Sequence, residues 1–143
     1  MKETRRMDAT IRFALLTVAA HAVVAICHAA AHQRLGIEMS ASQTSFIVAD
    51  IIIAPLVAGV WLWKRAGAAG AFLLTLSMAG ALVFGVYHHF VASSADHVAH
   101  VAAASPGVWA KAFQVTAVLL ALVETLGVGA GLWALKRILA CRS

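Results

Sequence analysis

The sequence predicts an all-helical integral membrane protein, a single domain over residues 1–143 that forms an antiparallel bundle of four transmembrane helices. Of these residues, 62% are hydrophobic and only 12% are charged, which is more apolar surface than a soluble domain of this length needs. Four apolar runs approach or exceed the roughly 20 residues that cross a bilayer as a helix. The runs do not alternate apolar and polar residues, as the strands of a membrane barrel do.

The first helix is expected over residues 12–31. A basic segment followed by an apolar run also fits a secretory signal peptide. Histidines at positions 21 and 28 would be unusual in the core of a signal peptide, so we treat this run as a true span.

The remaining helices are expected over residues 45–63, 70–90 and 108–135. In the second, Pro55 lacks a backbone N–H and predicts a kink. The segment 91–107 between the last two helices is long enough for a short interfacial helix.

Basic residues predict the orientation, because Lys and Arg beside the spans stay on the cytoplasmic side. Only Arg34 and Lys111 lie at the opposite ends of the spans. We therefore expect both termini in the cytoplasm and the chain in a bacterial-type inner membrane, with a net charge of +5 that favours anionic lipid and gives no reason to expect nucleic acid. The residues at the expected inner ends are Lys2, Arg5, Arg6, Arg12, Lys64, Arg65, Lys136, Arg137 and Arg142.

Imidazole and carboxylate side chains gather at the expected outer face, and this mixture suits transition metals such as Zn, Fe or Cu. His28 with His32, and Asp96 with His100, are four residues apart, which places each pair on one face of a helix. Any one of these histidines could serve only as an interfacial hydrogen-bonding residue, but so many donors at one depth favour a metal site. The candidate ligands are His28, His32, Asp50, His88, His89, Asp96 and His100.

A second set of polar residues is expected to support that site. His21 and Glu124 fall near mid-depth, where ionisable side chains are costly and normally mark function or pairing. They could form a structural pair or a proton relay. The other supporting candidates are Glu38, His97, Lys111 and Gln114.

These features favour a membrane metal-binding protein, either a metal-dependent oxidoreductase or hydrolase or a redox protein, whose lipophilic substrate arrives from the membrane. One alternative is an electron carrier with haem b between His28 and His88, although haem has no need of Asp50 and Asp96. A transporter of metal ions or protons is another. A homo-oligomer or an accessory subunit of a larger membrane complex also stays open.

Overall fold

A computed structural model describes residues 2–64 and 67–141, with side chains from residue 9 onward. All regular secondary structure in these two ranges is helical. The predicted all-helical chain with four helices that are long and apolar enough to span a membrane is confirmed. The four are longer than the sequence suggested: Ala9–Leu35, Ala41–Trp63, Gly67–Val91 and Val108–Ala140.

Two of these helices contain wider π-helical turns, and a short helix occupies the segment before the last span, where the sequence predicted one. The elements in order are α1 (Lys2–Leu35), α2 (Ala41–Phe46), η1 (Ile47–Ile53), α3 (Ala54–Trp63), α4 (Gly67–Val86), η2 (Tyr87–Val91), α5 (Val98–Ala104) and α6 (Val108–Ala140).

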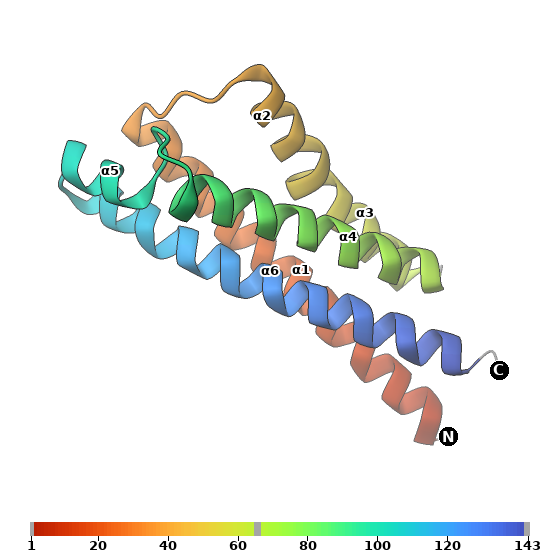
Figure 1. Cartoon of the computed structure of the whole chain (residues 1–143). Coiled ribbons are helices and arrows are strands. Elements are labelled where there is room, and N and C mark those ends of the chain that lie inside the picture. The colour runs from red at the N-terminus through yellow and green to blue at the C-terminus, as the bar shows by residue number, and fades with distance from the viewer. Residues whose placement is uncertain (1, 65–66, 142–143) are drawn as a thin grey trace.

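The long helix α6 lies along both α1 and α4, and α3 packs on α4 (Figure 1). The helix α1 also contacts α3 but has little direct contact with η1 and α2. As a result the second span is close to α1 at one end and diverges from it at the other (Figure 1). Helix α1 begins, and α6 ends, at the end of the bundle where the second span stays close to α1 and where Lys64 follows α3 (Figure 1). We call this the closed end and the opposite one the open end. Arg65 and Arg142, on which the predicted orientation partly rests, lie outside the described residues.

The closed end is packed through small side chains, which let transmembrane helices approach closely. Leu62, Leu74 and Met78, at 0–1% exposure, fill the space between them. A separate apolar cluster, built around Phe113, lies at the open end beneath α5. The small buried residues of the closed end are Ala14, Ala58, Ala71, Ala130 and Ala134.

The predicted disturbance at Pro55 takes the form of a π-helix. Proline at this position cannot donate a backbone hydrogen bond to the preceding turn. The chain relaxes into the wider turns of η1 immediately before it, and the Ala54 N–H bonds to the carbonyl of Ala49, five residues back. Such turns are rare and are found frequently at functional sites.

Glycine permits the closest approach between α4 and α6. A Cβ added at Gly131 would lie 2.9 Å from the backbone nitrogen of Thr75 and 3.1 Å from the carbonyl oxygen of Ala71. These are backbone atoms, so the two helices themselves would have to separate. A Cβ added at Gly129, on the same helix, meets nothing within 4 Å.

We therefore expect Gly131→Ala to destabilise the bundle by about 1–3 kcal/mol, the usual cost of overpacking a well-packed contact. The measurement is the midpoint of unfolding in detergent as sodium dodecyl sulfate is added. Gly129→Ala is the matched control and should leave the midpoint unchanged or slightly raised. An equal loss in both variants would show that the α4–α6 contact is not the cause.

Candidate metal centre

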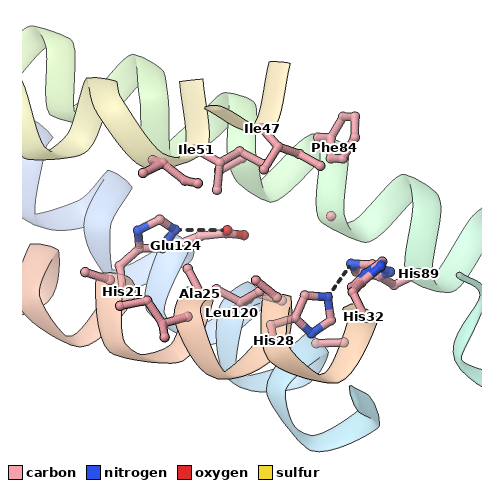
Figure 2. Close-up of a pocket in the computed structure, with 18 of the residues that line it drawn as sticks. His21, Ala25, His28, His32, Ile47, Ile51, Phe84, His89, Leu120 and Glu124 are labelled. Atoms are coloured by element: carbon pink, nitrogen blue, oxygen red, sulfur yellow. Dashed lines mark hydrogen bonds and ion pairs between the residues drawn. The ribbon is translucent and has the colours of Figure 1, made fainter. Parts of the chain in front are cut away.

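Three buried histidines converge at the open end of the bundle. His28 and His32 lie on successive turns of α1, and His89 comes from η2. One ring nitrogen from each lies within 4.8 Å of the others, and the three residues are only 6–7% exposed. Figure 2 shows the three rings turned toward one another from the two helices.

The contacts of His28 favour one tautomer. Its Nδ1 lies 2.8 Å from the hydroxyl oxygen of Thr116. That hydroxyl has a single hydrogen, which it donates to the carbonyl oxygens of Ala112 at 2.7 Å and Phe113 at 3.1 Å. With the hydroxyl hydrogen directed to these carbonyls, Thr116 accepts a hydrogen bond from the Nδ1–H of His28, and Nε2 of His28 then presents a lone pair.

The same reasoning applies to His89. Its Nδ1 lies 3.1 Å from the carbonyl oxygen of Asp96, which can only accept, and 3.5 Å from the carboxylate Oδ2 of the same residue. The hydroxyl of Ser94 donates to Oδ1 of that carboxylate at 2.6 Å and holds it in place. Nδ1 of His89 therefore carries the proton, and its Nε2 also carries a free lone pair.

The Nε2 atoms of His28 and His89 face each other, 3.2 Å apart. In the tautomers described above, both atoms present lone pairs and do not hydrogen-bond to each other. A cation between them would turn this repulsion into attraction. Tetrahedral zinc with Zn–N bonds of about 2.0–2.1 Å separates its ligand nitrogens by roughly 3.3 Å, which is close to the observed spacing.

His32 completes the set. Its ring centroid lies 4.8 Å from that of His28 and 5.9 Å from that of His89. Its Nδ1 is buried and has no hydrogen-bond partner among the described residues, which is costly for a polar atom unless a ligand satisfies it. The ring of Phe113 lies beneath all three imidazoles, with centroids 4.8, 5.0 and 5.3 Å away, and restricts their orientation.

The surroundings resemble those of known metal ligands. Histidines that bind metals usually donate their second ring N–H to a carboxylate, a carbonyl or another acceptor, which fixes the tautomer and the ring orientation. His28 does so to Thr116, and His89 does so to Asp96. The residues present therefore fit a divalent transition metal held by three imidazole nitrogens.

A second polar pair lies deeper in the bundle, as the sequence suggested it could. Nε2 of His21 is 3.4 Å from Oε1 of Glu124, and the two side chains are 2–3% exposed. This is an ion-pair distance, and His21 Nε2 has no hydrogen-bond partner among the described residues. A Cβ added at Gly85 would lie 3.8 Å from Oε2 of Glu124 and 4.0 Å from the ring of His89, so the absence of a side chain there leaves space between pair and cluster.

A cavity of about 370 Å³ joins the two polar groups. Its walls come from α1, the second span, α4 and α6, and most of its lining side chains are aliphatic or alanine. In Figure 2, Ile47 and Ile51 face His21, Ala25 and His28 across this space.

Three predicted ligands lie away from the cluster. His88 is the neighbour of His89 but packs its ring on Phe84, with centroids 4.4 Å apart. His100 is exposed, and its Nδ1 bonds to the carbonyl oxygen of Ser94 at 3.0 Å. Asp50 is half-buried, and its carboxylate packs against Gly80 of α4, where an added Cβ would lie 2.5 Å from Oδ2. That oxygen has no hydrogen-bond partner among the described residues.

The supporting candidates are likewise dispersed. His97 caps α5 by accepting from the N–H of Ala99 at 3.2 Å, and Gln114 donates to the carbonyl oxygen of Val98 at 3.2 Å. Glu38 and Lys111 are exposed. Asp96, a predicted ligand, instead holds Nδ1 of His89.

Sequence reasoning missed Thr116 and Phe113. A threonine inside a transmembrane helix usually bonds to the carbonyl of its own preceding turn, as Thr116 also does, so nothing in the sequence marks it.

Comparisons of the chain with protein families, with curated proteins and with solved structures found no match.

Thr116→Val should weaken zinc binding roughly 10- to 100-fold, the usual cost of removing a partner that orients a ligand, because Nδ1 of His28 loses its acceptor. Competition with a chromophoric chelator measures the affinity. Thr116→Ser keeps the hydroxyl and should bind zinc as the wild type does. Unchanged affinity in Thr116→Val would show that this contact does not orient His28.

Proposed function

We propose that the chain is an integral membrane metalloprotein that binds a transition metal, Zn, Fe or Cu, through His28, His32 and His89. The observation that carries this proposal is the convergence of three buried imidazoles whose ring nitrogens lie within 4.8 Å of one another, two of them in contact at 3.2 Å, while Nδ1 of His32 has no hydrogen-bond partner among the described residues. A hydrogen bond between the two rings, with Thr116 donating to Nδ1 of His28, would also satisfy the contact, and so would protonation of one ring at the cost of a buried charge, but neither gives Nδ1 of His32 a partner. A metal shared by three imidazoles satisfies the two facing nitrogens and gives the third ring a role.

We further propose that the centre is an active one, in a metal-dependent oxidoreductase or hydrolase or in a redox protein. Structural zinc sites usually have four protein ligands, whereas catalytic ones have three and keep a position open. The cluster offers three ligands and borders the cavity. When bound, the metal would supply Lewis acidity, an activated water or electron transfer at that open position.

The remaining polar residues then have defined tasks. Asp96 and Thr116 hold the N–H groups of two ligands, so that only Nε2 is directed into the site. Glu124 and His21 lie across the cavity and can hold or move a proton for a molecule bound there. The aliphatic walls exclude water and strengthen every electrostatic interaction inside.

The alternatives have less support. The sequence suggested a haem between His28 and His88, but the ring of His88 packs on Phe84, and the histidine that meets His28 is His89, with their Nε2 atoms 3.2 Å apart. A transport pathway would have to continue toward the closed end, where Leu62, Leu74 and Met78 fill the bundle. We therefore propose neither haem nor transport.

Metal analysis of detergent-purified protein tests the proposal. The wild type should carry, or take up from Zn²⁺, Fe²⁺ or Cu²⁺, a near-stoichiometric amount of metal, and His28→Ala and His89→Ala should lose it. His100→Ala removes an exposed histidine outside the cluster and should retain the metal. A wild-type protein that stays metal-free with all three ions would refute the proposal.

For the membrane, we propose insertion in a bacterial-type inner membrane, with the metal centre toward the outer face. The sequence has two cysteines, so the variant Cys27→Ser leaves Cys141 as the single labelling site. Cys141 is exposed and follows α6 at the closed end. A membrane-impermeant maleimide should label Cys141 only after cells are permeabilised, whereas a cysteine placed at the exposed Ser40 should react in intact cells. The opposite pattern would reverse the orientation and leave the metal centre unaffected.

A further inference from the structure

We infer that the cavity binds a neutral lipophilic molecule with one terminal oxygen function, such as a long-chain alcohol, which enters sideways from the bilayer between α1 and the second span. This inference rests on the proposed metal centre for the role of the oxygen and on the cavity itself for the role of the chain.

The mouth of the cavity lies at membrane depth. Ile26 of α1 and Ile52 and Leu56 of the second span line the cavity and are also exposed at 70%, 43% and 47%. Ile52 and Leu56 belong to the middle part of Ala41–Trp63, where a spanning helix faces hydrocarbon. Because α1 has little direct contact with η1, the cavity can open to lipid on this side, although the exposed Gln33 and Met39 also line it near the loop between α1 and α2. A molecule that enters here comes from the lipid phase.

The size and lining of the cavity fit one small apolar ligand. A volume of about 370 Å³ falls within the range of about 300–1,000 Å³ typical of ligand pockets, which are mostly apolar with a few polar groups that orient the ligand. The imidazole cluster lies at one end and the His21–Glu124 pair farther along, with aliphatic walls between them (Figure 2). An alkyl chain matches these walls, and an oxygen at its end reaches the open position of the metal.

The charges of the lining favour an uncharged ligand. Asp96 and Glu124 are the two acidic side chains that line the cavity, and no Lys or Arg lines it in the part of the chain that the structure describes. When His21 is neutral and a divalent metal is bound to three neutral imidazoles, the carboxylates of Asp96 and Glu124 balance the charge of the metal. A carboxylate or phosphate group on the ligand would add an unpaired negative charge in a low-dielectric site.

A photoreactive probe tests the inference in the metal-loaded protein in phosphatidylcholine vesicles. We use dodecanol carrying a diazirine near the end of its chain and map the cross-links by mass spectrometry. Ala117 and Leu120 line the cavity from α6, which we call its rear wall, and are only 2% and 9% exposed. A probe must therefore enter the cavity to label them. Labelling of this pair should be displaced by excess dodecanol and only weakly by dodecanoate.

Two variants and one control define the route. Ala25→Phe fills the cavity from α1, and Ile51→Trp fills it from η1. Each should lower rear-wall labelling about tenfold, because the large side chain takes the space that the ligand needs. Ala30→Phe adds the same ring at an exposed position of α1 that does not line the cavity, and it should label as the wild type does.

Metal content, measured on the same samples, separates the two proposals. Retained metal together with lost labelling in Ala25→Phe or Ile51→Trp supports the ligand route. Metal-free wild type with intact rear-wall labelling refutes the metal centre and leaves the lipophilic cavity standing. The inference would be overturned by equal labelling in the wild type and both filled variants. Equal competition by dodecanol and dodecanoate would also overturn it, and so would cross-links that show a second copy of the chain over the mouth.

Discussion

The site depends on the contact between Nε2 of His28 and Nε2 of His89. Each imidazole is held at its other nitrogen: His28 by the hydroxyl of Thr116 and His89 by the carbonyl of Asp96. When Thr116 donates its one hydrogen to the carbonyl of Ala112 instead of to His28, both rings present lone pairs to each other across 3.2 Å. In water such a contact would be relieved by rotation or protonation, but here burial and the ring of Phe113 oppose both. A cation between the rings would stabilise this arrangement, as the proposed metal centre requires.

The rest of the bundle makes this geometry possible by being packed unequally along its length. At the closed end, Gly131 and the alanines allow backbone-to-backbone contact between helices, which holds the scaffold rigid where no chemistry is expected. At the open end, the second span leaves α1, and two π-helical segments replace regular turns. A rigid end and an open end in one short bundle give a cavity whose walls are helices, which is a more precise support for ligands than loops would be.

The cavity links groups that lie far apart in the sequence into one chemical environment. The imidazole cluster and the His21–Glu124 pair both border it, and Gly85 leaves the space between them free of a side chain. Carboxylates inside a low-dielectric space are expensive unless they face positive charge. Glu124 and Asp96 supply two such carboxylates, and a divalent metal on neutral imidazoles would supply the charge that they face. The inferred preference for an uncharged molecule from the lipid phase rests on this balance.

The sequence by itself determined the properties that depend on local composition and helical periodicity: four apolar helices, and one face of α1 that carries His21, His28 and His32. It also suggested that His21 and Glu124 could meet, because two costly side chains at one depth have reason to pair. Only the tertiary structure decided between His88 and His89. The two are neighbours, and the wider turn of η2 together with the packing of α4 on α6 determines which ring faces inward. Thr116 and Phe113 likewise became part of the site only through the position of α6 beside α1. Residue spacing along one helix fixes which side chains share a face, but the packing of whole helices fixes which faces meet.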